Sequence, residues 1–212
     1  MSREFLFVLS IDHGGRPKRG FEDLGASVDV DGDGIADHTE VDCNTFIASA
    51  AARAIRHERD VDVVIISHGE YNERHGWSNR YDATAYLALH INSHRRADVN
   101  QGLFFHHHRT RKGNGDALAA ALADAWRPEA KRLLGRRMEV KALPATLPAW
   151  KNPHYTIKGL REPVGICCEP WFLSNPDHRR AFATAGGLQA LGQAMGRGLL
   201  TWARRRNRRR VA

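Results

Sequence analysis

The chain has 212 residues, 42% of them hydrophobic and 26% charged, with a formal net charge of +8. This length suits one domain with a substantial core, and no apolar run reaches the roughly 18 residues that a membrane-spanning helix needs. The three cysteines, two of them adjacent, lack the pattern of a disulfide framework and favour a reducing compartment.

Apolar runs alternate with segments that have a helical repeat. Short apolar runs predict buried strands, and a repeat near 3.6 residues predicts helices. In chain order, we expect strands at residues 5–11, 62–67, 85–91, 102–108 and 164–168, and helices at residues 41–59, 79–85, 116–134 and 177–203, the last kinked near Gly186 and Gly187. This alternation predicts an α/β fold, a single domain whose sheet is covered by helices on both faces.

Basic residues gather at the end of the chain. Six arginines lie between Arg204 and Arg210, so we expect a folded domain of residues 1–203 followed by a basic tail of residues 204–212. Such a tail attracts polyanions such as nucleic acid, lipopolysaccharide or anionic wall polymers, although it can also be solvated without a specific partner. The start of the chain lacks the features of a secretory signal, so we expect a soluble chain made in the cytoplasm.

Several apolar runs end on ionisable side chains. Asp12 and His13 follow the first run, and His68, His90 and Glu169 follow three later ones. The carboxyl ends of parallel strands meet at one edge of an open α/β sheet, so we expect these side chains to lie close together. Two or three histidines with a carboxylate are the ligands of a zinc site, and a catalytic site also needs a carboxylate that is not a ligand. A single histidine at a strand end is more often bonded to a loop, but the repetition favours a metal centre.

Four motifs lie in the order typical of one enzyme family. They are IDHGG at 11–15, EVDCNTFIASA from Glu40, RYDATAYLALHIN at 80–92 and GICCEPWFLSN at 165–175. Together they resemble the zinc-dependent N-acetylmuramoyl-L-alanine amidases of cell-wall hydrolases and phage endolysins. The resemblance covers most of residues 5–185 and implies a mixed, mostly parallel sheet.

The resemblance also implies site residues and an activity. His13, Glu40 and His90 would bind zinc, and Glu169 would be the catalytic carboxylate. The reaction would be hydrolysis of the amide bond between N-acetylmuramic acid and L-alanine in peptidoglycan, with zinc polarising the carbonyl and Glu169 moving the proton.

The chain departs from the family pattern at three places. Asp12 stands where the family usually has Gly, His68 where it often has Arg, and Pro170-Trp171 where Gly is common. We expect these departures to affect substrate contacts more than the metal. We also expect Gly14 and Gly15 to leave open space beside the metal for a wall polymer.

Glu40 also fits a second kind of metal site, a calcium-binding acidic loop. The segment DVDGDGIADHTE fits the EF-hand calcium loop with Glu40 as its twelfth ligand, but the preceding segment has no helical repeat. An EF-hand needs a helix on each side, so we assign Glu40 to zinc. The remaining carboxylates could still bind calcium, and these are Asp29, Asp31, Asp33 and Asp37.

The other histidines and the cysteines are weaker candidates for functional residues. His68 would be the replacement ligand, and His154 lies in a loop that could touch substrate. The tract His106–His108 is expected to line the cleft or face solvent, since alternate side chains of a strand point to opposite faces. Cys167 and Cys168 lie in an apolar run and are expected in the core.

The role expected from the resemblance is that of a phage-type endolysin. Without an export signal, the enzyme would wait in the host cytoplasm and act on the cell wall after release. The basic tail would bind an anionic wall or outer-membrane polymer, and nucleic acid is a less expected partner. The alternatives are a zinc carboxypeptidase or peptidase acting on the stem peptide of peptidoglycan, and a polyanion-binding module without enzymatic activity.

Overall fold

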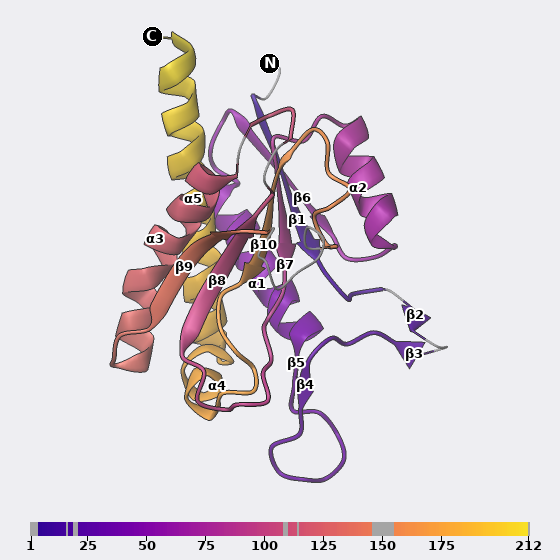
Figure 1. Ribbon diagram of the computed structural model, residues 1–212, viewed down its shortest axis with the longest axis vertical. Helices are drawn as coiled ribbons and strands as arrows, with labels where there is room; N and C mark the ends of the chain where they lie inside the picture. The colour runs from indigo at the N-terminus through magenta and orange to yellow at the C-terminus, as the bar shows by residue number, and fades with distance from the viewer. Residues whose placement is uncertain are drawn as a thin grey trace.

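A six-stranded sheet runs through the middle of the folded molecule (Figure 1). The computed structural model describes residues 4–15, 17–18, 21–107, 110–113, 115–145 and 155–211. The sheet has the order β6-β1-β7-β10-β8-β9, formed by β1 (Phe5–Ile11), β6 (Val61–Ile66), β7 (Ala85–Leu89), β8 (Gln101–His106), β9 (Glu139–Pro144) and β10 (Val164–Glu169). Two short strand pairs lie outside it, β2 (Pro17–Lys18) with β3 (Phe21–Glu22) and β4 (Ser27–Val28) with β5 (His38–Thr39).

Four neighbouring strands of the sheet are parallel. Leu9 of β1 is level with Ile65 of β6 and Leu87 of β7, and Leu89 of β7 is level with Cys168 of β10. We call the edge at which β6, β1, β7 and β10 end, and the residues that directly follow them, the carboxyl edge. β8 runs antiparallel to β10, and β9 runs parallel to β8, so these two strands end at the opposite edge.

Helices cover both faces of the sheet, which confirms the expected α/β fold. α1 (Glu40–Ile55), α3 (Asp116–Leu134) and α5 (Ala185–Val211) pack on one face, and α4 (Pro176–Phe182) joins them at one end. α2 (Tyr71–Arg80) lies on the other side (Figure 1), where the segment 155–163 also packs. Because strand side chains alternate, Phe7 packs with the first set of helices and Val8 with the second layer.

Several elements differ from the sequence prediction, among them the short strands β2 to β5, which were not predicted. The helix expected at residues 79–85 is wrong, because α2 begins at Tyr71 behind a capping box formed by Glu70 and Glu73, and Ala85 already starts β7. Strand β9 was not predicted. The break in the last helical region falls between Phe182 and Ala185, directly before the two glycines.

The basic residues near the end of the chain continue α5. Arg204 pairs with Glu58 at 2.9 Å, and Asn207 donates to Glu4 at 2.7 Å. The boundary expected at residue 203 therefore does not coincide with the end of an element. Among the described residues, no helix combines the length and apolar character that crossing a membrane requires.

His178 of α4 holds the segment that follows β10. The backbone N–H of Phe172 donates to its Nδ1 at 3.0 Å, so Nε2 carries the hydrogen that is donated to Asn100 Oδ1 at 3.0 Å. Burial, followed by the nearby charge of Arg136, lowers the pKa of His178 to about 4, although Asp177 opposes the shift. The imidazole is therefore neutral in the folded chain.

This buried histidine predicts a pH dependence of stability. Between about pH 6.5, the ordinary histidine pKa, and the folded pKa of about 4, the unfolded chain binds a proton that the folded chain does not. The contribution of His178 is complete above pH 6.5 and should fall by about 2–3 kcal/mol as the pH drops to about 4. Urea unfolding of the wild type, His178→Gln and the exposed control His57→Gln would measure it. A pH slope for His178→Gln equal to that of the control would contradict the assignment.

Candidate metal centre

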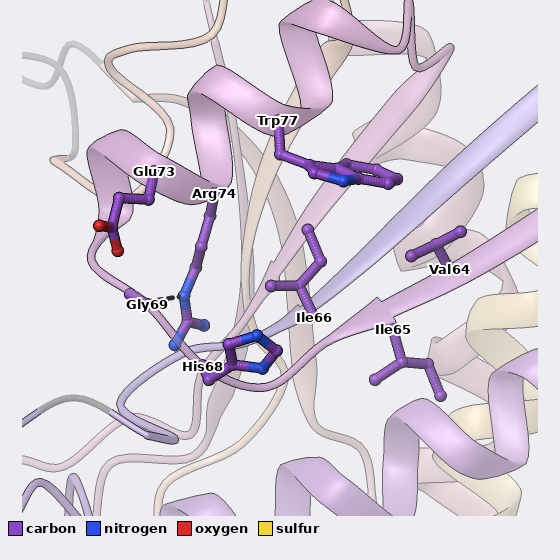
Figure 2. A pocket seen from close by; sticks show the side chains of 8 residues that line it. All are labelled: Val64, Ile65, Ile66, His68, Gly69, Glu73, Arg74 and Trp77. Atoms are coloured by element: carbon purple, nitrogen blue, oxygen red, sulfur yellow. Dashed lines mark hydrogen bonds between the residues drawn. The ribbon is translucent and has the colours of Figure 1, made fainter.

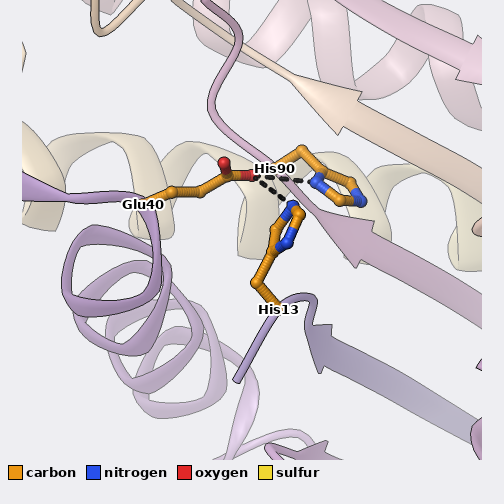
Figure 3. Close-up of side chains that lie close together, drawn as sticks. All are labelled: His13, Glu40 and His90. Atoms are coloured by element: carbon orange, nitrogen blue, oxygen red, sulfur yellow. Dashed lines mark hydrogen bonds and ion pairs between the residues drawn. The ribbon is translucent and has the colours of Figure 1, made fainter. Parts of the chain in front are cut away.

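The carboxyl edge brings three potential ligands together (Figure 3). His13 lies two residues beyond β1, His90 follows β7, and Glu40 is the first residue of α1. One ligand atom of each lies within 4.8 Å of the others, and the two imidazole rings are 5.1 Å apart. Residues that are far apart in the sequence therefore form one His-Glu-His cluster.

The geometry and donor set of the cluster fit a divalent metal ion. Glu40 Oε1 lies 3.6 Å from His13 Nε2 and 2.8 Å from His90 Nδ1. A tetrahedral zinc ion with bonds of about 2.0–2.2 Å holds its ligand atoms about 3.4 Å apart, and two histidines with one glutamate form an established catalytic ligand set. A small widening of the contact between Glu40 and His90 would admit the ion.

Backbone groups aim the carboxylate of Glu40 into the cluster. Thr39 caps α1 by accepting from Asp42 N at 3.1 Å, which places Glu40 in the first turn. Its Oε2 accepts from Ala26 N at 2.9 Å, and its Oε1 accepts from Ile91 N at 3.0 Å. The side chain is almost fully buried, so its direction is fixed before any ion binds.

The turn after β1 is tight and strained. His13 has a φ of 70°, a left-handed conformation that costs a non-glycine residue about 1–3 kcal/mol and is typical of functional sites. A Cβ on Gly15, whose φ is 61°, would lie 2.7 Å from His68 Cβ and 2.9 Å from Ser67 O. The glycines therefore make room for the chain after β6, and the expectation that they border open space is wrong.

Each histidine of the cluster also faces an outer carboxylate. His13 Nδ1 lies 2.9 Å from Asp23, and His90 Nε2 lies 2.8 Å from Asp12. The expectation that Asp12 acts on the substrate side is wrong, because its fully buried carboxylate lies behind His90. Asp23 was not singled out from the sequence, since it follows no apolar run.

The charges around the cluster favour a dication. Burial lowers the pKa of His90, but the charges and hydrogen bonds of Asp12 and Glu40 outweigh it and raise the pKa to about 10. The metal-free chain therefore holds a proton here that an incoming ion must displace. Three carboxylates, those of Asp12, Asp23 and Glu40, contact the two histidines. Their negative charge attracts a divalent cation more strongly than a monovalent one.

Glu169 stands beside the cluster without belonging to it. It ends β10, next to His90, whose backbone N–H donates to Cys168 O at 2.9 Å. Asn92 Nδ2 donates to its Oε2. Burial raises the pKa of Glu169 to about 7, with Glu40 adding to the shift and His90 opposing it. A carboxyl group with a pKa near neutrality suits proton transfer.

His68 does not join the cluster. It is exposed and lines a pocket of about 370 Å³ between β6 and α2 (Figure 2). Arg74 lines the same pocket and bonds to Ile11 O at 2.6 Å and to Gly69 O at 2.8 Å. This arginine lies in a polar helix, and the sequence of that helix has no apolar repeat from which the helix could be predicted.

The other sequence candidates lie elsewhere. His106 ends β8, which runs antiparallel to β10, so the tract leaves the sheet at the edge opposite the cluster. The expectation that it could line the cleft is wrong for His106 and for the buried His107, because sequence alone did not give the strand direction. His108 and His154 lie outside the described residues. Cys167 and Cys168 are buried in the core as expected, and burial raises the pKa of both thiols.

The acidic loop forms a separate, exposed group of carboxylates. Potential ligand atoms of Asp29, Asp31 and Asp37 lie within 4.8 Å of one another, and Asp33 accepts from Ile35 N at 2.8 Å. β4, rather than a helix, precedes the loop, and Glu40 lies in the His-Glu-His cluster instead of this acidic group. Hydrogen bonds from backbone N–H groups of the loop lower the pKa of Asp29. Calcium at these four aspartates stays a prediction.

Comparisons with known proteins agree on the fold. No family model and no curated protein matches the chain. Among solved structures, the catalytic domain of CwlV, an N-acetylmuramoyl-L-alanine amidase from Bacillus (Paenibacillus) polymyxa var. colistinus, has a TM-score of 0.72 at 16% identity and covers 94% of this chain and 98% of its own. The amidase AmiC2 of Nostoc punctiforme has a TM-score of 0.70 at 22% identity, covering 96% and 99%. An N-acetylmuramoyl-L-alanine amidase from Clostridium difficile 630 has 0.68 at 16%, covering 95% and 98%. This chain therefore has the fold of the N-acetylmuramoyl-L-alanine amidases.

Proposed function

We propose that the chain is a zinc-dependent amidase that cleaves the bond between N-acetylmuramic acid and L-alanine in peptidoglycan. The observation that carries this proposal is the cluster of His13, Glu40 and His90 at the carboxyl edge of an amidase fold, with Glu169 on the adjoining strand. Neither the fold nor the cluster alone specifies a reaction, but their combination supports this one.

The residues divide the chemistry between them. His13, Glu40 and His90 hold the ion, which supplies a Lewis acid for the scissile carbonyl and for water. Glu169 accepts the proton of the attacking water and returns it to the departing alanine nitrogen. Asn92 donates to Oε2 of Glu169 and so restricts the orientation of this carboxylate.

The products of digestion should distinguish the proposed activity from a stem-peptide carboxypeptidase. We expect digested peptidoglycan to release whole stem peptides with a new amino-terminal L-alanine, measured by mass spectrometry. Glu169→Gln should lower kcat by at least about 100-fold while zinc stays bound, since general acid–base catalysis contributes at least this much. The exposed Glu139→Gln is the matched control. Release of carboxyl-terminal amino acids would favour the peptidase instead.

The metal content of variants should reveal the ligands. We expect the wild type to purify with zinc, His90→Ala and Glu40→Ala to lose it, and the exposed control His57→Gln to retain it, measured by inductively coupled plasma mass spectrometry. Removing one of three protein ligands leaves too few donors for a stable site. If Glu169→Ala lost the metal and Glu40→Ala kept it, the assigned roles would be reversed. If the chain bound polyanions equally well with and without a chelator and hydrolysed no substrate, this would favour the alternative of a polyanion-binding module without enzymatic activity.

We further propose that the basic end of α5 binds an anionic wall or outer-membrane polymer. Arg205 and Arg208 are exposed there, whereas Arg204 pairs with Glu58. Acting on the wall after release from the host cytoplasm, as an endolysin, stays a prediction of the sequence.

The double variant Arg205→Gln/Arg208→Gln should bind lipoteichoic acid or lipopolysaccharide more weakly than the wild type. The difference should be largest at low salt, because salt screens exposed charges. Co-sedimentation at two ionic strengths would measure it, with the exposed pair Arg95→Gln/Arg137→Gln as the control of equal charge change. Equal loss in both double variants would count against a specific role for this helix end.

A further inference from the structure

In each histidine of the cluster, the ring nitrogen that points away from the proposed ion is hydrogen-bonded to a carboxylate. We propose that Asp12 and Asp23 are positioning residues that set the tautomer and direction of His90 and His13, and that Arg74 holds Asp12 in place for this purpose. The inference rests on the proposed metal site and concerns residues that do not touch the ion.

The tautomers follow from the hydrogen-bond partners. A carboxylate only accepts, so His90 Nε2, 2.8 Å from Asp12 Oδ2, carries a hydrogen, and so does His13 Nδ1, 2.9 Å from Asp23 Oδ2. His90 Nδ1 and His13 Nε2 both face Glu40 Oε1, the side on which an ion would bind, so the ion would replace the hydrogen that His90 Nδ1 carries in the metal-free chain. The two ligands therefore use opposite ring nitrogens, each set by its own carboxylate.

Asp12 is more deeply buried than Asp23. Its Oδ1 accepts from Ser10 Oγ at 2.6 Å and lies 3.4 Å from Arg74 Nη1, which also donates to Ser10 Oγ at 3.0 Å. Asp12, Ser10 and Arg74 are at most 1% exposed. Asp23 Oδ1 accepts from Gly25 N at 3.2 Å, within a loop, and the residue is 8% exposed.

Arg74 ties this network to the turn that carries His13. Its guanidinium donates to Ile11 O at 2.6 Å and to Gly14 O at 2.5 Å, on either side of Asp12 and His13. The arginine reaches this turn from α2, beside the pocket between β6 and α2 (Figure 2). One buried side chain thus fixes both the strained turn and the carboxylate behind His90.

The alternative is that Asp12 serves only as the counter-ion of Arg74. The two oxygens of Asp12 have separate partners. Oδ1 contacts Ser10 and Arg74, and Oδ2 contacts His90. A counter-ion role requires only the first contact, whereas a positioning role requires the second. Measurements on the metal ligand can therefore separate the two roles.

The first test is the zinc dissociation constant of the full chain, measured by competition with a chromophoric chelator. Loss of an outer carboxylate that orients a metal-bound histidine typically weakens metal binding by about 10- to 100-fold. We expect Asp12→Asn to show this loss, Asp23→Asn to show a smaller one, and Asp98→Asn, which removes an exposed ion pair with Arg96, to stay within about twofold of the wild type.

The second test is ¹⁵N NMR of the imidazole rings in the zinc-loaded wild type. We expect His90 to carry its hydrogen on Nε2 and His13 on Nδ1, and Asp12→Asn to perturb the ring signals of His90 more than those of His13. Asp23→Asn should give the reverse. Thermal unfolding of each metal-free variant reports any purely structural effect.

The outcomes separate this inference from the proposed function. A wild type that binds no zinc overturns both. A wild type that binds zinc through His90 Nε2, or a folded Asp12→Asn that binds zinc within about twofold of the wild type, overturns the inference alone. If Asp12→Asn does not fold, the ring nitrogens identified in the wild type decide the question.

Discussion

The parallel pairing of β1, β7 and β10 is the constraint on which the site depends. Their register places the ends of neighbouring strands level, so residues that follow them meet without any further device. His13, His90 and Glu169 owe their proximity to this alignment, and α1 then delivers Glu40 from the covering layer. A change of register by one residue would turn every side chain of the shifted strand to the other face of the sheet and separate the ligands.

The site stores unfavourable free energy that the surrounding structure offsets. Buried carboxylates are costly unless they are hydrogen-bonded and matched by opposite charge. Backbone N–H groups of Ala26 and Ile91 satisfy Glu40, and Arg74 together with a proton on His90 balances part of the charge. The strained backbone at His13 adds to the cost. Such a site is preorganised, because its groups need little movement to take up an ion.

Sequence patterns predicted the parts of the structure that local signals encode. Continuous apolar runs gave β1 and the other buried parallel strands, and the strand-end residues with the family motifs gave His13, Glu40, His90 and Glu169 as the candidate site. α2 was missed because the segment YNERHGWSNR has little apolar periodicity, and β9 because it is largely exposed. Arg74 lies 60 or more positions beyond its partners near His13, so no local pattern could reveal the contact. Strand direction is likewise not encoded in an apolar run.

The path of α5 places the exposed arginines and the His-Glu-His cluster at opposite ends of the molecule. Its 27 residues form a rod of about 40 Å, and its final turns bond to Glu4 and Glu58, which precede β1 and β6. The arginines therefore sit where strands begin, about 20 Å from where the same strands end, given the length of a seven-residue strand. A polymer bound by this end of α5 would be held at one end of the molecule. A distant stretch of the wall could then reach the metal ligands at the opposite end. The arginines would then act as a tether that keeps the enzyme near its substrate, rather than as a lining of the groove in which a bond is cut.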